Sequence, residues 1–306
     1  MHDGDAGRRR RNLLPVFGSG QGHNRHQPPR GCRRSGGHAL QRLPKIATSL
    51  GDPRITVVTG GASGIGRGAA MRQARGGDAV IIADINEEGA ASVVSEITEN
   101  GGKASFVPCD VAEEAQIAAL FDTVETEHGP IDVLINSAGI LQNPEAIEDT
   151  SMADYDRVHA INVRGLYVCC REIAPRMQAR QRGVILNIAS NTSLRAFPLP
   201  AYGPAKSAVM ALTEILAAEL GPYRIRVNAV APTACLTPPL QARIDAGERD
   251  YDMIVGNNAI PRMLVPEDVA EGIFFLCSDR AKAVTGATLP VDYGWQVWLS
   301  YRAYPK

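Results

Sequence analysis

Residues 59–66 read TGGASGIG and stand between two patterned segments of the chain. A short β-branched run, RITVVTG, leads into them and predicts a buried strand, and residues 64–77 predict a helix closed by two glycines. Gly60, Gly64 and Gly66 have no side chains, so the backbone can turn tightly there and approach a pyrophosphate. The N-terminus of the following helix adds free N–H groups and the positive end of the helix dipole. The stretch therefore predicts the phosphate-binding turn of a dinucleotide-binding fold.

An acidic residue ends the next apolar run, AVIIAD, which predicts a second strand over residues 79–84. Asp84 lies 18 residues after Gly66, near the spacing that is typical of a carboxylate bound to an adenosine ribose. A helix cap is the alternative, because Glu87 follows three residues later at capping-box spacing. Ribose binding would set the carboxylate against the additional phosphate of NADP, so this interpretation predicts NAD as the cofactor.

Short apolar runs continue to alternate with helix-like segments from residue 54 to near the C-terminus. The further predicted strands cover residues 103–110, 131–139, 183–190, 225–232 and 287–292. The further predicted helices cover residues 86–102, 112–129, 151–180, 202–220 and 266–279. Strands that are apolar throughout and separated by helices indicate a parallel sheet covered on both faces. We therefore expect an α/β fold, a Rossmann-like doubly wound parallel sheet of seven strands, in one NAD-binding catalytic domain over residues 53–306.

Two segments stand outside this alternation. Residues 233–262 are a long insertion with little pattern, which we expect to form a lid over the substrate.

Residues 1–52 carry 9 Arg and 1 Lys against 3 Asp, and about a quarter of them are Gly or Pro, in a chain of net charge −1. Such a segment buries too little apolar surface to offset its ordering entropy, so we expect a disordered basic extension. A nucleic-acid-binding arm through RRRRN at residues 8–12 is one alternative, and a transit peptide is another.

The cysteines show no metal-ligand spacing. None of the six forms a Cys-x-x-Cys pair or lies beside clustered histidines: they are Cys32, Cys109, Cys169, Cys170, Cys235 and Cys277. We interpret them as small buried hydrophobes in a reducing cytoplasm, and we expect no metal. The longest apolar run of the extension, Leu13 to Phe17, is too short for a signal core or a membrane span, so we expect no membrane association.

A tyrosine and a lysine lie four residues apart in LPAYGPAKSAV, residues 199–209. With 8 Tyr and 5 Lys in 306 residues, chance alone gives about 0.13 such pairs, and the motif needs its context. On a helix Tyr202 and Lys206 share one face, and a nearby cation favours the phenolate of a side chain whose ordinary pKa is about 10. The pair is therefore a candidate for proton exchange with an alcohol.

Five motifs follow one another within residues 54–294. They are the glycine turn, NSAG at 136–139, Asn162 in INVRG, Ser190 in NIAS, and YGPAK at 202–206. In this combination the chain resembles the short-chain dehydrogenase/reductase family. The resemblance implies an NAD-dependent oxidoreductase that interconverts a secondary alcohol and a ketone. It leaves the small-molecule substrate open among acyl-carrier ketoesters, steroids, sugars and cyclic diols.

The resemblance also implies a role for each motif. Tyr202 would be the general acid/base, Lys206 would hold the nicotinamide ribose and lower the tyrosine pKa, and Ser190 would bind the substrate oxygen. Asn162 would open its helix to seat a water in the proton relay. The implied cofactor-binding residues are Gly60, Ser63, Gly64, Ile65, Gly66, Asp84, Asp110, Val111, Asn136, Ala138, Gly139, Tyr202, Lys206, Pro232, Cys235 and Thr237.

The chain departs from the family pattern at a few positions. Ser190 precedes Tyr202 by one residue fewer than is usual, which leaves Ser193 as a rival for the catalytic serine. Thr233 and Tyr293 stand where the family has glycines, and they restrict the backbone beside the cofactor or the pocket. The aromatic C-terminus, DYGWQVWLSYRAY, predicts core packing or a subunit interface.

By the same resemblance we expect a homotetramer, or at least a dimer, assembled through the helices at residues 151–180 and 202–220. Two other functions stay open at this point. One is a non-catalytic dinucleotide-binding sensor on the same fold, against which the intact Tyr202 and Lys206 argue. The other is a nucleic-acid-associated protein acting through the basic extension.

Overall fold

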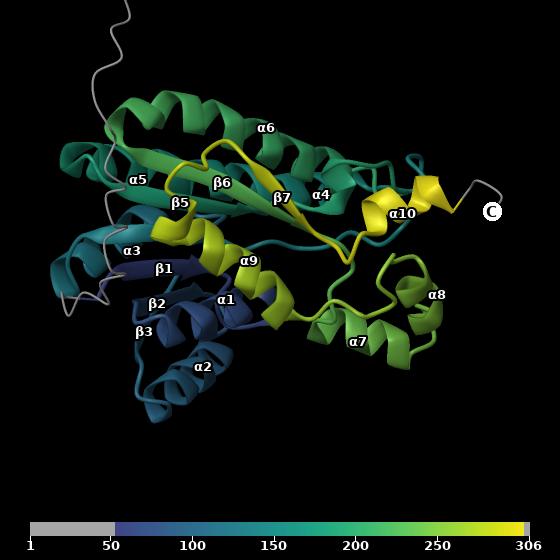
Figure 1. Cartoon of the computed structure of the whole chain (residues 1–306), viewed down its shortest axis with the longest axis horizontal. Coiled ribbons are helices and arrows are strands. Elements are labelled where there is room, and N and C mark those ends of the chain that lie inside the picture. The colour runs from purple at the N-terminus through teal and green to yellow at the C-terminus, as the bar shows by residue number, and fades with distance from the viewer. Residues whose placement is uncertain (1–52, 303–306) are drawn as a thin grey trace, which may run out of the picture. The chain divides into compact units, whose positions relative to one another are not determined.

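Seven parallel strands form one sheet in a computed structural model of the chain, which describes residues 53–302 (Figure 1). The strand order is β3-β2-β1-β4-β5-β6-β7. The strands are β1 (Ile55–Thr59), β2 (Ala79–Asp84), β3 (Lys103–Pro108), β4 (Ile131–Asn136), β5 (Gly183–Ile188), β6 (Ile225–Pro232) and β7 (Thr288–Val291). Each lies within a segment that the sequence predicts as a strand, and the expected doubly wound α/β fold is confirmed. The basic extension and its expected disorder lie outside the described residues.

Helices cover both faces of this sheet, as Figure 1 shows. Their bounds are α1 (Gly64–Arg75), α2 (Glu87–Glu99), α3 (Glu114–Glu127), α4 (Met152–His159), α5 (Leu166–Arg180), α6 (Tyr202–Leu220), α7 (Pro238–Asp245), α8 (Tyr251–Gly256), α9 (Pro266–Cys277) and α10 (Trp295–Tyr301). Residues of α1, α2 and α9 share one hydrophobic cluster with the strands, and residues of α3, α5 and α6 share another. The inner strands are therefore buried from both sides, which is why they are apolar without alternation. Within residues 53–302, no helix has both the length and the apolar character that a bilayer crossing requires.

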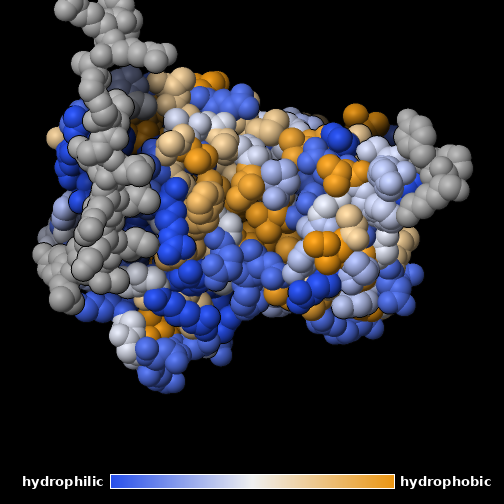
Figure 2. Space-filling model, viewed as in Figure 1, coloured by the Kyte–Doolittle hydropathy of each residue, from blue (hydrophilic) through white to orange (hydrophobic). Residues whose placement is uncertain are grey.

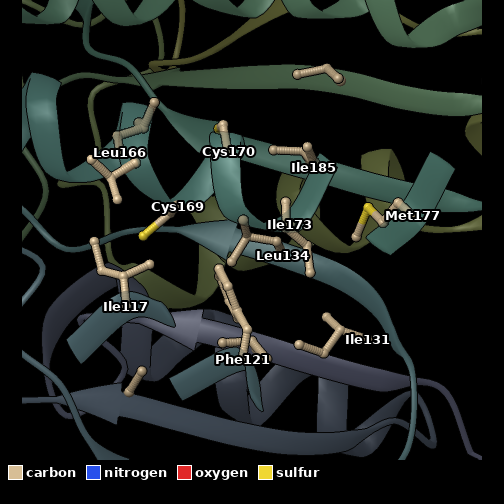
Figure 3. Packing of buried hydrophobic residues seen from close by; sticks show 14 of the residues in the cluster. Ile117, Phe121, Ile131, Leu134, Leu166, Cys169, Cys170, Ile173, Met177 and Ile185 are labelled. Carbon is tan, nitrogen blue, oxygen red and sulfur yellow. The ribbon is translucent and has the colours of Figure 1, made fainter. Parts of the chain in front are cut away.

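Apolar side chains of α3 and α5 pack against the sheet in one hydrophobic cluster (Figure 3). Ile117 and Phe121 lie four residues apart on α3, and Ile173 and Met177 lie four apart on α5. These side chains and Leu134 of β4 are all fully buried. Full burial of side chains of this size stabilises the fold by roughly 1.5–3 kcal/mol each. The apolar positions of both helices thus fasten this layer to the sheet.

The strand order changes direction between β1 and β4. The chain runs outward from β1 through β2 to β3, then returns to β4 on the other side of β1 and continues to β7. In doubly wound sheets, ligands bind outside the carboxyl ends of the strands at this change of direction. The glycine turn follows β1 and the NSAG motif ends β4, so the fold brings both to the expected ligand position.

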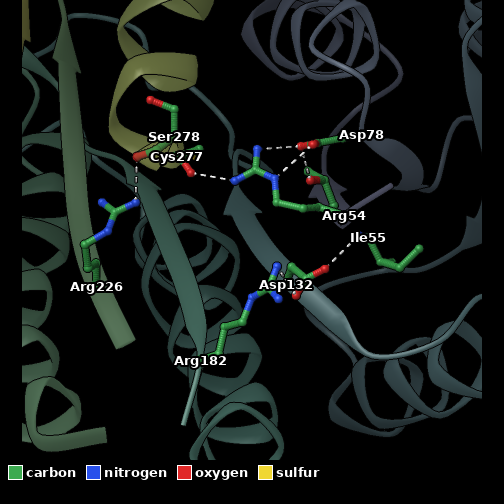
Figure 4. A network of polar contacts seen from close by, with 9 residues as sticks. Arg54, Ile55, Asp78, Asp132, Arg182, Arg226, Cys277 and Ser278 are labelled. Atoms are coloured by element: carbon green, nitrogen blue, oxygen red, sulfur yellow. Dashed lines mark hydrogen bonds and ion pairs between the residues drawn. The ribbon is translucent and has the colours of Figure 1, made fainter. Parts of the chain in front are cut away.

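A polar network ties β1 to α9 at the opposite, amino edge of the sheet (Figure 4). Asp78, which is 5% exposed, accepts two hydrogen bonds from Arg54 at 3.0 Å and one from the Thr56 hydroxyl at 2.7 Å. Arg54 also donates to the Cys277 carbonyl at 2.8 Å. A buried carboxylate with three donors holds the strand and the helix together at this edge.

The segment at residues 233–262 is more regular than the sequence indicated, because it contains α7 and α8. Pro238 occupies the first turn of α7, where no N–H donor is needed, and the Asp250 carboxylate caps α8 by accepting from the Met253 N–H at 3.0 Å. The sequence did not predict these two helices, and the role of the segment as a lid stays a prediction. Helices of 8 and 6 residues are too short to show a clear apolar period.

The aromatic C-terminus contains α10, which the sequence did not predict. Trp295 is 8% exposed and stacks on Phe197 with ring centroids 5.2 Å apart. Tyr293 adopts a left-handed backbone with φ of 50°, and its hydroxyl donates to Asp268 at 2.9 Å. The expected core packing is therefore present for Trp295. Tyr293, which stands where the family resemblance implies a glycine, therefore has a strained backbone and a side-chain hydrogen bond.

Candidate functional site

The glycine turn packs too closely for side chains. A Cβ atom on Gly66 would lie 2.0 Å from the Gly60 carbonyl oxygen, and one on Gly60 would lie 2.7 Å from the Ala138 Cα. Gly60 and Gly64 also have φ of 67° and 53°, which is a left-handed backbone that glycine adopts without strain. A Cβ on Gly64 would lie 3.2 Å from Thr237 Cγ2, so the fold brings this predicted site residue to the turn.

The N-terminus of α1 presents donors without a side-chain cap, since the Ser63 hydroxyl makes no capping hydrogen bond. Asp84 lies beside it and accepts from the Ala62 N–H at 3.0 Å and from the Asn86 N–H at 2.9 Å. Asn86, rather than Asp84, caps α2 by accepting from the Gly89 N–H at 3.0 Å. The helix-cap interpretation of Asp84 is therefore wrong, and its carboxylate belongs to the glycine turn.

The end of β4 is held against β1 and β5. The Thr59 hydroxyl accepts from the N–H groups of Ser137 and Ala138 at 3.2 and 3.3 Å. Asn136 donates to the Asn187 side-chain oxygen at 2.9 Å. The Asn136 side-chain oxygen is buried and has no hydrogen-bond partner among the described residues. This leaves one acceptor at the carboxyl edge of the sheet for a further donor.

Asn162 lies in a π-helical turn, Ala160–Gly165, between α4 and α5. The predicted helix begins as expected, after the Ser151 cap, and then widens at this turn. Asn162 accepts from the Ile140 N–H at 2.8 Å and donates to the Ile140 carbonyl at 2.9 Å. A Cβ on Gly139 would lie 3.0 Å from the Asn162 oxygen and 3.7 Å from Lys206 Nζ. The helix is thus opened at the residue for which the family resemblance implies it, and π-turns are frequent at functional sites.

Tyr202, Lys206 and Ser190 meet where α6 starts beside the end of β5. Lys206 is 5% exposed, donates to the Ile188 carbonyl at 2.7 Å and has its Nζ 5.7 Å from the centre of the Tyr202 ring. Burial raises the pKa of Tyr202 to about 12, and a hydrogen bond with Ser190 opposes that rise. Burial lowers the pKa of Lys206 to about 8. Burial is the largest cause of this shift and Ser190 is the group that opposes it, so the lowering of the tyrosine pKa expected from Lys206 is not seen in the protein alone.

The two candidate serines differ in their surroundings. Ser190 lowers the pKa of Tyr202, and its hydroxyl accepts from the Thr192 N–H at 3.2 Å and donates to the Asn191 side-chain oxygen at 3.3 Å. Asn191 in turn donates to the Thr233 hydroxyl at 3.0 Å. The Ser193 hydroxyl is buried without a partner among the described residues. The geometry favours Ser190 as the catalytic serine. Thr233, which departs from the family pattern, hydrogen-bonds the Asn191 side chain that orients Ser190.

The other predicted cofactor residues divide by where their side chains lie. Asp110 follows β3 and accepts from the Ala112 N–H at 2.9 Å. Val111 and Cys235 pack into the hydrophobic clusters, and burial raises the pKa of the Cys235 thiol to about 12. Pro232 is the last residue of β6 and is buried. Val111, Cys235 and Pro232 could therefore offer a ligand their backbone and not a reactive side chain.

Sequence reasoning missed the residues that hold these groups in place. Gln142 accepts from the backbone N–H groups of Ala201 and Tyr202, each at 2.9 Å. Asn187 and Asn191 are further examples, since they orient Asn136 and Ser190. No signal in the sequence points to Gln142, because its partners lie about 60 positions away in the chain. Among the residues that the structure describes, no group of His, Cys, Asp or Glu side chains could hold a metal ion.

Comparisons with known proteins agree over nearly all of the described chain. Residues 60–296 match the family model described as enoyl-(acyl carrier protein) reductase. The cyclopentanol dehydrogenase of Comamonas sp. (strain NCIMB 9872) is 36% identical over 243 residues, which cover 79% of this chain and 96% of that protein. A solved short-chain type dehydrogenase/reductase from Mycobacterium ulcerans is 32% identical, with a TM-score of 0.76 over 80% of this chain and 90% of that one. The structure of ElxO with NADP bound is also 32% identical, with a TM-score of 0.75 over 80% and 99%.

Proposed function

This chain belongs to the short-chain dehydrogenase/reductase family, and on that premise we propose that it interconverts a secondary alcohol and a ketone by NAD(H)-dependent hydride transfer. That it is an enzyme of this oxidoreductase family, whose fold binds a nicotinamide dinucleotide, follows from the matches themselves. The use of NAD and the Tyr-Lys mechanism are our proposal. The observation that carries the proposal is that Tyr202, Ser190, Lys206 and Asn162 gather at the same sheet edge as the glycine turn.

The described residues fit a bound dinucleotide. The glycine turn leaves no room for a Cβ at Gly66, and the N-terminus of α1 has no side-chain cap, so a pyrophosphate could meet its N–H groups. Asp84 uses one carboxylate oxygen on Ala62 and the other on Asn86, and each oxygen has a further lone pair for a ribose hydroxyl. The unpartnered Asn136 oxygen supplies one more acceptor at this edge.

The catalytic roles that the family resemblance implies suit what each side chain can do. A bound nicotinamide would supply or accept the hydride. Tyr202, protonated below its raised pKa, would donate its proton to a ketone oxygen and accept it back from an alcohol. Ser190 would hydrogen-bond the same oxygen. Lys206, whose ammonium group is held by the Ile188 carbonyl, would bind the nicotinamide ribose. Asn162, in its π-turn beside Gly139, would connect Tyr202 and Lys206 to a water molecule.

The pH profile of reduction tests the role of Lys206. The lysine is charged below a pKa of about 8 and neutral above it, whereas Tyr202 keeps its proton up to about 12. We therefore expect kcat/KM for the reduced cofactor to fall about tenfold between pH 7 and pH 9 as the charge is lost. Lys282→Gln, which changes an exposed lysine, should leave the profile unchanged. A flat profile to pH 10 would contradict the assignment of Lys206.

The choice between NAD and NADP is expected to follow Asp84. A phosphate at the ribose would meet this carboxylate, and like charges about 4 Å apart at an effective dielectric near 20 cost about 4 kcal/mol. Solvent and side-chain movement relieve part of this, so we expect a preference of about 2–4 kcal/mol, or roughly 30- to 1,000-fold in kcat/KM for NAD. Asp84→Asn keeps an acceptor for Ala62 and should lose most of the preference. Parallel kinetics with both cofactors decide the matter, and equal or better use of NADP would overturn the NAD assignment.

The substrate class is proposed from the surroundings of Tyr202 and from the relatives. The relative named above acts, by its name, on cyclopentanol, a cyclic secondary alcohol. Phe197, in the loop that leads to Tyr202, stacks on Trp295, and an apolar pair there would suit an apolar ring better than a charged substrate. NADH formation with cyclic, linear and polyhydroxylated secondary alcohols tests the proposal. Absence of turnover with every alcohol and both cofactors would favour the dinucleotide-binding sensor instead.

Assembly and location stay predictions. Figure 2 shows hydrophobic side chains gathered over β7 and the neighbouring α9, and Phe275 of α9 is 42% exposed. On the α5–α6 side, Tyr167 is 50% exposed and Ile215 is 60% exposed. Two separate apolar surfaces suit the homotetramer expected from the family resemblance. A cytoplasmic location and a nucleic-acid-binding arm find no further support in the described residues.

A further inference from the structure

The start of α6 carries Tyr202 but has no cap of its own. The residue at the N-cap position is Ala201, which has no side-chain oxygen for the first N–H groups of the helix. Tyr202 is the first helical residue, so its ring direction depends on how this first turn is held. A helix start that frays would move the phenol relative to Ser190.

Gln142 supplies the missing cap from a distant loop. Its side-chain oxygen accepts from the N–H groups of Ala201 and Tyr202, both at 2.9 Å. Its side-chain nitrogen donates to Glu145 at 2.7 Å and to the Thr150 hydroxyl at 3.2 Å. All four hydrogen bonds that a glutamine amide can make are formed, and the side chain is only 8% exposed. The amide has one orientation, because the backbone donors need its oxygen and the carboxylate needs its nitrogen.

The remaining N–H groups of this turn are also accounted for. The Gly203 N–H donates to the Leu199 carbonyl at 2.9 Å, Pro204 has no N–H, and the Ala205 N–H begins the helical pattern by donating to Ala201 at 3.2 Å. Gln142 is therefore the side chain on which the first two donors depend. Loss of its amide would leave both donors unpaired in a buried turn.

The loop that carries Gln142 is itself tied to the segment before Tyr202. The Glu145 N–H donates to the Pro198 carbonyl at 3.0 Å, and the Thr150 hydroxyl donates to the Glu145 carboxylate at 2.8 Å. The same Glu145 oxygen that binds Thr150 accepts from Gln142. The loop and the start of α6 thus form one hydrogen-bonded unit that includes the backbone N–H of Tyr202.

We propose that Gln142 is a positioning residue that fixes the backbone of Tyr202 and so keeps its phenol on Ser190 and beside Lys206. The inference rests on the proposed function, because it assigns Tyr202 the proton transfer. Without the cap, the first turn of α6 has two unpaired donors and shifts to satisfy them. The phenol then loses its alignment with Ser190 while the cofactor residues at β1, β2 and β4 keep theirs.

The following variants distinguish an effect on the position of Tyr202 from a general loss of stability. Gln142→Met keeps the length of the side chain and removes all four hydrogen bonds. Gln142→Glu keeps the acceptor for the two N–H groups but sets a second carboxylate against Glu145. Combining it with Glu145→Gln exchanges donor and acceptor, restores the bond between the two side chains and preserves the net charge. Ser151→Ala is the matched control, since it removes a helix cap whose side-chain hydrogen bonds run to Asp154 within α4 and leaves the bonds of Gln142 in place.

In the full-length enzyme, with the best alcohol and cofactor from the panel, Gln142→Met should lower kcat about 10- to 100-fold, as a misplaced catalytic group does. KM for the cofactor should change less than threefold. The pH midpoint of alcohol oxidation should rise, because Tyr202 loses its alignment with Ser190, which lowers the pKa of the phenol. Gln142→Glu should be impaired as well, and the exchanged pair should return to within about threefold of the parent enzyme.

Two kinetic results overturn the inference. One is a Gln142→Met enzyme that, like Ser151→Ala, loses only thermal stability and keeps its kcat and pH midpoint. The other is an exchanged pair no more active than Gln142→Glu. If the parent protein turns over no alcohol, the proposed function fails, and hydrogen exchange of the Tyr202 amide decides the positioning separately. Faster exchange in Gln142→Met that the exchanged pair reverses supports it, and unchanged exchange overturns it.

Discussion

Tyr202→Phe is expected to lower kcat by about 10²- to 10⁴-fold, the usual contribution of a general acid/base group. The substitution removes only the phenolic oxygen. The ring that lies 5.7 Å from Lys206 Nζ and the backbone contact with Gln142 both stay. Binding of the cofactor should therefore survive, and cofactor fluorescence can measure it beside steady-state turnover.

Tyr223→Phe is the matched control, because this tyrosine follows the far end of α6 and is 38% exposed. It should keep the activity of the parent enzyme. Retention of most of the turnover in Tyr202→Phe would show that another group moves the proton. Loss of cofactor binding together with turnover would show that the phenol anchors the dinucleotide and is not chiefly an acid/base.

Asp78→Ala is expected to destabilise the fold by about 3–5 kcal/mol, the cost of breaking a buried ion pair from one side. The change leaves Arg54 without its paired carboxylate, and it leaves the Thr56 hydroxyl buried without a partner. Arg54 is also the residue that links the start of β1 to the end of α9 through the Cys277 carbonyl (Figure 4). Urea unfolding of the full-length protein measures the difference in free energy of unfolding.

Glu271→Gln provides the comparison, since it breaks an ion pair between α9 and Arg72 of α1 in which Glu271 is 66% exposed. An exposed pair of this kind contributes at most about 1 kcal/mol. Equal losses in the two variants would mean that the Asp78 network carries no special stability.

The sequence alone predicted the order of the strands and helices and the local motifs. Residues 202–220 were predicted as a helix and form one with those bounds, because their propensities and apolar spacing are local properties of the chain. The glycine turn was equally readable, since Gly60, Gly64 and Gly66 can adopt a backbone that other residues avoid. The short helices α7, α8 and α10 escaped prediction because so few residues show no reliable period.

The contacts between motifs required the tertiary structure. The preference for Ser190 over Ser193 depends on which hydroxyl faces Tyr202, and one missing residue in the intervening loop left both serines open in the sequence. The pKa values of Tyr202 and Lys206 depend on burial, which helical spacing does not contain. Gln142 meets Tyr202 across 60 residues, and hydrogen bonds between distant segments arise only when the sheet has brought the ends of its strands together. The sequence contains the residue types and their local spacing, whereas the alignment of these groups is a property of the packed fold.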